Sequence, residues 1–341
     1  MHLAGRPWAR YPGFGLRNVT LLPETRRWFG EATVQSVPWT VEELIAAKQG
    51  RTVSVVLPAL NEEATLGALV AELRGMVGGL VDELLVMDSG STDRSAEVAR
   101  EAGAHVVACT DVLPELAPWP GKGEVLWRSL AATSGDVLVF IDSDLVDFHP
   151  GFVPALLGPF LLWHQIPGHR LSEQRVELVK GFYRRPLRIE NSEVGTGGGR
   201  VTELLARPLL NALRPELAGV IQPLGGEYAA TRAFLESVPF AAGYGVEIGL
   251  LLDAHTRHGL DGLAQVNLGV RKHRNRSLLE LGVMARQILG AALPRCGVPE
   301  TPGSPCITQF VQLGTHFTPT ESEVLVADRP PMRDVLAARS T

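Results

Sequence analysis

The chain has 341 residues, of which 45% are apolar and 20% are charged. This length and apolar content are enough for a sizeable core and exclude a globally disordered chain. The net charge of −5 and the pI of about 6.0 give no electrostatic basis for nucleic-acid binding. Any anion site must therefore be a local cluster of basic side chains.

Cysteine usage and the apolar segments predict a cytoplasmic protein without a membrane span. The three cysteines, Cys109, Cys296 and Cys306, are odd in number and include no CxxC pair, which favours reduced thiols over disulfides or a zinc site. The first residues lack the apolar core of a signal peptide. The best candidate for a membrane segment, Phe152–Trp163, contains two prolines and is shorter than the roughly 20 residues that span a bilayer, so we expect a buried helix there.

From residue 51 onward, short apolar strands alternate with amphipathic helices. The strands are predicted at Thr52–Leu57, Glu83–Met87, Ala104–Val107 and Val137–Ile141. The helices between them are predicted at Ala64–Met76, Thr92–Ala102 and Gly123–Thr133. This alternation predicts an α/β fold with a mostly parallel central sheet and helices on both faces. Ligands of such sheets bind beyond the carboxyl ends of the strands, so the residues directly after each strand are the candidates for a site.

The rest of the chain divides into an extension, a second half and an arm. Residues 1–50 are predicted to be an N-terminal extension with a short helix at Thr40–Lys48, residues 51–150 a first α/β half, residues 151–298 the second half of the same domain, and residues 299–341 a C-terminal arm. The second half contains a polar insert, His164–Arg175. Its further elements are a strand at Val176–Phe182, helices at Val201–Leu213, Glu247–His258 and Leu278–Leu293, and a segment that could form a strand at Leu263–Leu268.

Two acidic residues follow the most apolar strand, as Asp142-Ser143-Asp144. Two carboxylates at the end of a buried strand are costly as bare charges, and a divalent cation removes that cost. A hard ion such as Mg²⁺ takes one or two carboxylates and completes its shell with phosphate oxygens and water. The alternative is a strand-end turn or a helix cap, which Asp and Ser both favour.

Polar residues also follow the first two strands. Pro58–Glu63 could present a rigid edge to a base or ribose, although Asn61 could simply cap the next helix. Asp88–Asp93 suits a nucleotide hydroxyl or phosphate, or an ordinary capped turn. Lys122, between two glycines, adds a cation that could reach a phosphate or could be solvated surface. Because several strand ends converge on one sheet edge, we expect a shared site there.

The second half supplies positive groups. Gly197–Thr202 opens a helix whose N–H groups, with Arg200, could hold a phosphate, although a flexible hinge is the alternative. Arg271–Arg276 has five basic residues in six and could also be a solvated face or a nucleic-acid patch. His273 within that run suits a neutral metal ligand better than a further cation. Glu247, in Tyr244–Glu247, could accept sugar hydroxyls or could be an ordinary first-turn glutamate.

A set of motifs, taken together, resembles glucosyl-3-phosphoglycerate synthases. These are retaining enzymes of glycosyltransferase family 81 with a GT-A fold, and the actinobacterial mannosyl-3-phosphoglycerate synthase belongs to the same family. The similarity extends from about Pro38 to about Pro331. The motifs occur here in the family's order, as VVLPALNEEAT, DSGSTD, PGKGE, FIDSD, TGGGRVTEL, GEYA, YGVEIGL and RKHRNR. The polar insert is longer than the corresponding loop of the glucosyl enzymes, which leaves the donor sugar open.

The resemblance implies a role for each matching position. Asp144 and His273 would bind Mg²⁺ or Mn²⁺, and Glu247, Asp144 and Arg200 would carry the chemistry. The nucleotide sugar would be held by Pro58, Ala59, Leu60, Asn61, Glu62, Ser89, Lys122, Asp142, Ser143, Tyr244, Glu247, Arg271 and Arg276. The acceptor, 3-phosphoglycerate, would be held by Gly199, Arg200, Val201, Thr202 and Asn275.

The resemblance thus implies a homodimeric hexosyltransferase that makes mannosyl- or glucosyl-3-phosphoglycerate for compatible-solute or methylglucose polysaccharide biosynthesis. GDP-mannose, GDP-glucose and UDP-glucose remain open as donors, with GDP-mannose favoured. One alternative is a polyprenyl-phosphate glycosyltransferase, which should carry a membrane anchor or an amphipathic helix that the sequence lacks. The other is a non-catalytic nucleotide-sugar sensor, against which the intact acids Asp142, Asp144 and Glu247 argue.

Overall fold

The structure is a computed structural model that describes residues 21–146, 148–163, 176–184, 187–189, 192–194, 199–270, 277–300 and 305–339, with side chains throughout except at 187–189 and 192–194. The polar insert at 164–175 and the basic run at 271–276 therefore lie outside the described residues. Among the described helices, none combines the length and apolarity needed to cross a membrane.

An eight-stranded sheet organises the molecule, in the order β1-β11-β6-β9-β5-β2-β3-β4. All neighbouring pairs are parallel except those of β9, which runs antiparallel to both β5 and β6. The predicted α/β fold with a mostly parallel sheet is therefore confirmed. The strands are β1 (Thr33–Val34), β2 (Val53–Ala59), β3 (Glu83–Asp88), β4 (His105–Ala108), β5 (Val137–Phe140), β6 (Leu178–Arg184), β9 (Tyr228–Thr231) and β11 (Leu263–Val270).

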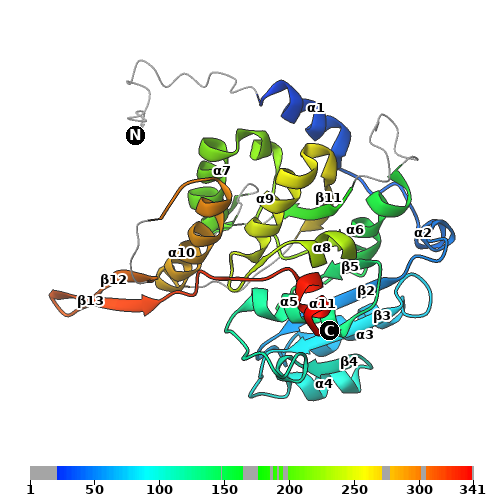
Figure 1. Cartoon of the computed structure of the whole chain (residues 1–341), viewed down its shortest axis with the longest axis horizontal. Helices are drawn as coiled ribbons and strands as arrows, with labels where there is room; N and C mark the ends of the chain where they lie inside the picture. Colours follow the sequence, from blue (N-terminus) through cyan, green and yellow to red (C-terminus); the bar gives the residue numbers. More distant parts are fainter. Residues whose placement is uncertain are drawn as a thin grey trace, which may run out of the picture.

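Helices cover the sheet and contribute to one large apolar core (Figure 1). Helix α6 packs on β5, β6, β9 and β11, whereas α5 packs on β2 and β3, and α9 packs against α10. Every residue of β5 is buried, which is why this strand reads as a continuous apolar run. The helices are α1 (Pro23–Ala32), α2 (Val41–Ala47), α3 (Leu66–Arg74), α4 (Ser95–Glu101), α5 (Lys122–Ala132), α6 (Phe152–Leu161), α7 (Arg207–Leu213), α8 (Arg232–Ser237), α9 (Val246–His258), α10 (Leu278–Arg295) and α11 (Met332–Arg339).

Residues 21–50, within the segment predicted as an extension, add a strand and two helices to this core. Strand β1 pairs in parallel with β11. The indole of Trp28 is buried and donates to the carbonyl of Leu263 at 2.8 Å, and that of Trp39 donates to Pro154 at 2.9 Å. Gly158 leaves room for Trp39, because a Cβ on this glycine would lie 1.9 Å from the indole.

The predicted helix at Val201–Leu213 forms, but it contains a π-helical turn at Thr202–Ala206 ahead of α7. The N–H of Arg207 bonds to the carbonyl of Thr202, five residues back. Pro208 supplies a reason, because proline has no N–H and its ring clashes with the carbonyl four residues earlier in a regular helix. Such turns occur often at functional sites.

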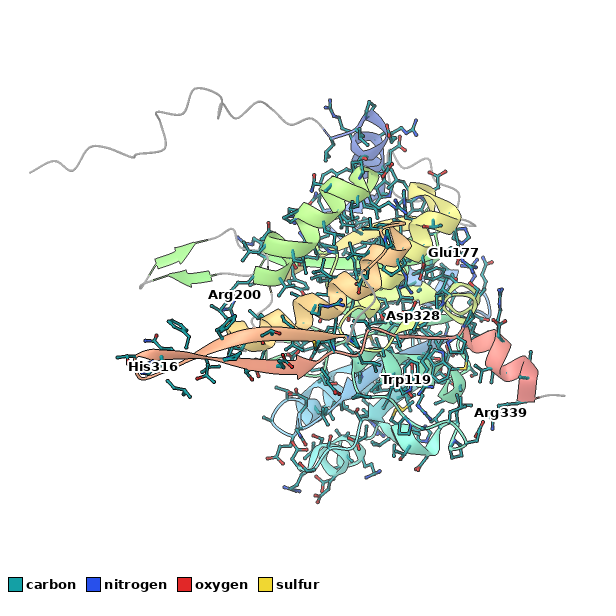
Figure 2. The ribbon with its side chains drawn as sticks, turned by 60° about the vertical axis from the view of Figure 1, so that its left-hand side comes forward. Trp119, Glu177, Arg200, His316, Asp328 and Arg339 are labelled. Carbon is teal, nitrogen blue, oxygen red and sulfur yellow. The ribbon has the colours of Figure 1, made fainter. Side chains whose placement is uncertain are left out.

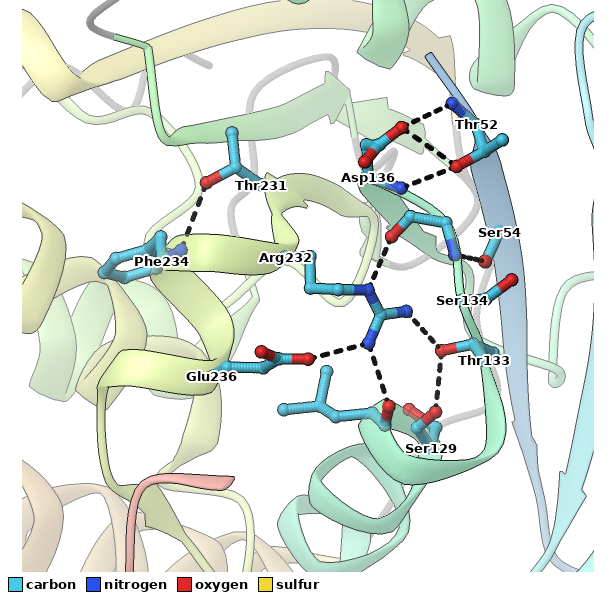
Figure 3. A network of polar contacts seen from close by, with 12 residues as sticks. Thr52, Ser54, Ser129, Thr133, Ser134, Asp136, Thr231, Arg232, Phe234 and Glu236 are labelled. Atoms are coloured by element: carbon cyan, nitrogen blue, oxygen red, sulfur yellow. Dashed lines mark hydrogen bonds and ion pairs between the residues drawn. The ribbon is translucent and has the colours of Figure 1, made fainter. Parts of the chain in front are cut away.

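A polar network fixes the amino ends of β2 and β5 (Figure 3). Arg232, the first residue of α8, donates to the carbonyls of Gly135 at 2.7 Å and Leu130 at 2.9 Å. The carboxylate of Asp136 accepts from both the N–H and the hydroxyl of Thr52, at 2.8 and 2.9 Å. These bonds brace the end of the sheet opposite the strand ends that carry the candidate site.

The C-terminal region consists of a hairpin, a short strand and a helix (Figures 1 and 2). The hairpin, with His316 near its tip, projects away from the body of the molecule. Strand β14 returns to the body and pairs antiparallel with β10, and α11 packs on α5 and α8. The predicted C-terminal arm therefore has regular structure. The strands outside the eight-stranded sheet are β7 (Leu187–Ile189), β8 (Ser192–Val194), β10 (Phe240–Ala241), β12 (Cys306–Leu313), β13 (His316–Glu323) and β14 (Asp328–Arg329).

Candidate active site

A mostly buried lysine, Lys122, joins two carboxylates from different parts of the chain. Lys122 Nζ lies 2.5 Å from Asp142 Oδ1 and 2.6 Å from Glu247 Oε1. Only 15% of the Lys122 side chain and 5% of that of Glu247 are exposed. Burial alone would lower the pKa of Lys122, but the two carboxylates raise it well above its usual value, so the ammonium stays charged. The alternative that Lys122 is solvated surface is wrong.

Glycines allow the close approach that this triad needs. A Cβ on Gly226 would lie 2.3 Å from Asp142 Oδ2. On Gly123 it would lie 1.7 Å from the carbonyl of Ala241. Gly121, the residue before α5, has a φ of +112°, which side chains other than glycine rarely tolerate. The glycines beside Lys122 therefore seat the start of α5 against β10.

The Asp142-Ser143-Asp144 segment is a turn fastened to the neighbouring strand end. The hydroxyl of Ser143 donates to the carbonyl of Pro58 at 2.7 Å, and its own carbonyl accepts from Thr65 at 2.6 Å. Ser143 is buried, whereas both aspartates are half-buried. The segment does not cap a helix, since the residue before α6 is Gly151. The turn interpretation is thus correct and the cap interpretation is wrong, and the turn is compatible with a bound cation.

The donor set suits a hard cation. Carboxylate oxygens at a strand end are the ligands that Mg²⁺ and Mn²⁺ prefer. Within the described ranges, no three His, Cys, Asp or Glu side chains gather into a metal-binding group. The second ligand predicted beside Asp144, His273, lies outside the described residues, as do Arg271, Asn275 and Arg276. The metal assignment therefore stays a prediction.

The loops after β2 and β3 are bonded to each other. The side-chain oxygen of Asn61 accepts from the N–H of Thr92 at 2.8 Å, and the N–H of Asn61 donates to Ser91 at 3.0 Å. The N–H of Glu62 donates to Ser95 at 2.7 Å. Asn61 has a φ of +57° and does not cap α3, whose preceding residue is Thr65, so the capping alternative is wrong.

The loop after β3 contains a capped turn, which was one of the two interpretations of Asp88–Asp93. The carboxylate of Asp88 accepts from the N–H groups of Gly90 and Ser91, each at 3.3 Å. Ser89 is half-buried and bonds through its N–H to the carbonyl of Ala59 at 2.9 Å. Together the two loops bring Pro58, Ala59, Leu60, Asn61, Glu62 and Ser89 to one edge, beside Ser143.

Glu247 is placed by the packing of α9 on α10. The N–H of Tyr244 donates to the side chain of Gln287 at 2.9 Å. Gly245 is needed there, because a Cβ would lie 2.5 Å from the Cβ of Ala291. Glu247 then falls in the first turn of α9, where a carboxylate is stabilised by the helix dipole. Both interpretations of Glu247 are therefore compatible with the structure, because the first-turn glutamate is also the partner of Lys122.

The segment predicted to hold the acceptor begins the helix that contains the π turn. The N–H of Glu203 bonds to the carbonyl of Gly199 at 2.9 Å. Arg200 is exposed (Figure 2), Val201 is half-buried and Thr202 is buried. Residues 200–202 start a helix here, whereas Gly197 and Gly198 lie outside the described residues, so the hinge alternative stays open.

Two features near this site were missed by sequence reasoning. Lys180 lies within the strand predicted at Val176–Phe182 and is 3% exposed. A lysine inside an otherwise apolar strand is a pattern that could have revealed it. The other is Arg329 of β14, which packs over the ring of Trp119 at 3.8 Å and bonds to Glu124 of α5. No local pattern indicates that contact.

Arg329 is the centre of a clamp that consists of Arg329, Glu124, Arg128 and Trp119. Arg329 Nε lies 2.6 Å from Glu124 Oε2, and Arg128 Nε lies 2.7 Å from Glu124 Oε1. Arg128 also bonds to the carbonyl of Leu116 at 2.6 Å, in the loop before α5. The clamp thus holds the helix that carries Lys122 against β14 and β10.

Comparison with known proteins gives a consistent family. Residues 54–167 match Glycosyl transferase family 2. The glucosyl-3-phosphoglycerate synthase of Mycolicibacterium smegmatis is 59% identical over 90% of this chain and 97% of its own. The crystal structure of the Mycobacterium tuberculosis synthase with Mn²⁺, UDP-glucose and phosphoglyceric acid is 55% identical, with a TM-score of 0.78 and coverage of 89% of this chain and 98% of that chain. The same enzyme with Mg²⁺ and UDP is 54% identical, with a TM-score of 0.79 and coverage of 89% and 99%.

Proposed function

The chain belongs to the glucosyl-3-phosphoglycerate synthase family, and on this premise we propose that it transfers glucose from UDP-glucose to 3-phosphoglycerate. It is a glycosyltransferase. One observation carries the substrate assignment, namely the 55% identity to a synthase whose structure contains UDP-glucose and phosphoglyceric acid together. Those ligands favour UDP-glucose over the GDP-mannose donor that the sequence favoured.

A donor panel tests this assignment. Purified protein with 3-phosphoglycerate and Mn²⁺ should release nucleotide fastest from UDP-glucose, compared with GDP-glucose and GDP-mannose. A kcat/KM for GDP-mannose above that for UDP-glucose would reverse the donor assignment. No release with any donor would contradict the function itself.

The bonded loops and the triad of Lys122, Asp142 and Glu247 support the proposed donor site. The residues of the loop edge, with Lys122, Asp142 and Ser143, would hold the nucleotide, and Tyr244, Glu247, Arg271 and Arg276 would line the sugar and diphosphate. Breaking the anomeric C–O bond leaves a diphosphate and a sugar with developing positive charge. Glu247 would stabilise that positive charge, and a cation bound by Asp144 and His273 would offset the growing charge of the diphosphate.

We further propose that the configuration at the anomeric carbon is retained by front-face attack. The acceptor hydroxyl oxygen bonds to C1 as the bond from C1 to the diphosphate oxygen breaks. The hydroxyl proton passes to that departing oxygen, so charges and atoms balance without a covalent enzyme intermediate. Trapping of a sugar on Glu247 or on another carboxylate would contradict this step.

The acceptor needs cations of its own, because 3-phosphoglycerate carries a carboxylate and a phosphate. The start of the helix at Gly199–Thr202 would supply N–H groups and Arg200 a guanidinium, with Asn275 beside them. Arg200→Met should raise the KM for 3-phosphoglycerate more than that for UDP-glucose. The reverse pattern would count against this acceptor site.

Metal dependence tests the roles proposed for Asp144 and His273. Asp144→Ala and His273→Ala should each abolish metal-dependent turnover, whereas His149→Ala, an exposed histidine near the turn, should not. Wild-type activity that survives excess EDTA would contradict the metal role.

We propose that the chain is a homodimer that buries the hairpin. Phe310 and Phe317 are 63% and 69% exposed. The β12–β13 register pairs Phe310 with Pro319 and Gln312 with Phe317, so both rings lie on one face. A projecting two-stranded hairpin is marginal in water alone, and a second copy would cover this face.

Light scattering tests the dimer. Phe310→Ser with Phe317→Ser should give a monomer, whereas Val77→Ser, an exposed valine on the body, should leave the dimer intact. A wild-type monomer would contradict the proposal.

A further inference from the structure

Lys180 is a buried lysine in the middle of the sheet. It lies opposite Tyr228 in the β6–β9 pair, and Tyr228 lies opposite Phe140 in the β9–β5 pair. Directly opposed residues share a face of the sheet, so the three side chains form one row. Phe140 is two residues before Asp142, which places this row directly beneath the triad of the candidate site.

The ammonium of Lys180 contacts a backbone carbonyl and an aromatic ring. Its Nζ donates to the carbonyl of Gly225 at 2.5 Å and lies 4.7 Å from the centre of the Tyr228 ring. Gly225 also approaches β6 closely, since a Cβ on it would lie 3.2 Å from the carbonyl of Gly181. Lys180 therefore ties the Gly225–Gly226 turn to the strand beside it.

That turn rests on the candidate site. Gly226 touches the carboxylate of Asp142 so closely that a Cβ could not be accommodated. Asp142 in turn holds Lys122, which holds Glu247. A shift of the turn would move the carboxylate of Asp142 and with it the ammonium of Lys122.

The charge of Lys180 acts on the same groups. Burial lowers its pKa to about 8, while the carboxylates of Glu247, Glu227 and Asp142 act to raise it and Lys122 acts to lower it. Without Lys180, the carboxylates of Glu247, Glu227 and Asp142 would lose one of the positive charges that act on them. An anionic diphosphate would then approach a more negative site.

We propose that Lys180 is a positioning residue for the nucleotide-sugar donor, which holds the Gly225–Gly226 turn against Asp142 and offsets the carboxylates beside the incoming diphosphate. This inference rests on the proposed donor site. It assigns no contact between Lys180 and the substrate. It predicts an effect on the donor that is separate from the acceptor and from folding.

The test compares Lys180→Met with Lys48→Met. Lys48 is also a buried lysine that bonds to a glycine carbonyl, Gly79 at 3.2 Å, and it pairs with Asp82 at the other end of the sheet. Calorimetric titration with UDP and Mn²⁺ should show at least tenfold weaker binding for Lys180→Met and unchanged binding for Lys48→Met. In steady-state assays, the KM for UDP-glucose should rise while that for 3-phosphoglycerate stays within twofold.

Thermal unfolding at pH 7 separates positioning from a structural role. Lys180→Met should melt no lower than wild type, because removing a buried ammonium removes its desolvation cost. UDP binding within twofold of wild type would overturn the proposal, and so would a large fall in Tm with equal losses for both substrates. If Lys180→Met does not fold, the same measurements are made on Lys180→Gln and judged by the same criteria. This variant keeps an N–H donor but removes the charge. UDP binding is measured without turnover, so it tests Lys180 even if the proposed acceptor proves wrong.

Discussion

Lys122 and Glu247 bring two helix N-termini to one point, since the first residue of α5 lies 2.6 Å from a carboxylate in the first turn of α9. Each helix start carries partial positive charge, and Lys122 adds a full one. Glu247 and Asp142 offset this charge within the buried group. The arrangement keeps a lysine charged beside the strand ends where the donor diphosphate is proposed to bind.

Removing the ammonium of Lys122 should strongly reduce both stability and UDP binding. Lys122→Met leaves Asp142 and Glu247 side by side without the cation between them, and breaking a buried ion pair costs roughly 3–5 kcal/mol. We expect a lower Tm and at least a hundredfold loss of UDP affinity by calorimetry. Glu247→Gln, which keeps the shape, should bind UDP within tenfold of wild type but lose most of its kcat. UDP affinity of Lys122→Met within threefold of wild type would be incompatible with the role proposed for this lysine.

A single methyl group should disturb Asp142. In Gly226→Ala the new Cβ would lie 2.3 Å from Asp142 Oδ2, so the carboxylate or the turn must move. We expect a folded protein with at least tenfold weaker UDP binding. Gly30→Ala is the matched control, because nothing lies within 4 Å of its added Cβ and the helix should gain about 0.5–1 kcal/mol. Equal UDP affinities in the two variants would show that Asp142 tolerates the displacement.

The clamp should support both stability and donor binding. Arg329→Met removes two buried bonds to Glu124 and one partly buried bond to the carbonyl of Ala117. We expect a loss of roughly 3–5 kcal/mol in the free energy of unfolding and a higher KM for UDP-glucose. Arg339→Met is the control, because its ion pair with Glu115 is about half exposed and such pairs contribute roughly 0–1 kcal/mol. Chemical denaturation of both variants measures the difference, and similar losses would argue against the clamp.

Lys180 should also change how the free energy of unfolding depends on pH. The pKa of Lys180 is about 8 in the folded chain, below its usual 10.5, so between these values the unfolded chain binds more protons. Stability contributed by this group therefore rises with pH across that window. Relative to Lys180→Met, wild type should gain up to about 3 kcal/mol between pH 7 and pH 10.5. Urea unfolding of both proteins at several pH values checks this, and a constant difference would contradict the lowered pKa.

Strong local patterns allowed much of the sheet to be predicted. The first four predicted strands match β2 to β5 to within two residues at either end, because each contains a continuous apolar run, which is buried in β2, β3 and β5 and half-buried in β4. Strand β9 was not predicted, since Tyr228–Thr231 is short and half alanine. The β12–β13 hairpin was missed because its apolar and polar residues do not alternate strictly and most of its side chains are exposed, so no buried face marks it as a strand pair.

The sequence predicted the part of the site that follows from the order of strands and helices, but not the contacts between distant segments. Parallel strands bring their carboxyl ends together, so the convergence of Asn61, Ser89 and Asp142 followed from the alternation of elements. The pairing of Lys122 with Glu247 depends on how α9 packs after a long intervening segment, which no spacing encodes. The ion pair of Lys48 with Asp82 lies at the other end of the sheet, away from the candidate site. Nothing in the sequence distinguishes that pair from the pair of Lys122 with Glu247.

The clamp also has a consequence for the order of folding. Arg329 and Glu124 are separated by 205 positions, and the indole of Trp127 bonds to the carbonyl of Pro330 across 203. Contacts this distant carry a high loop-closure cost, whereas the βαβ units of the first half form from near neighbours. During refolding, the recovery of tight UDP binding should therefore lag behind the return of the helical circular dichroism.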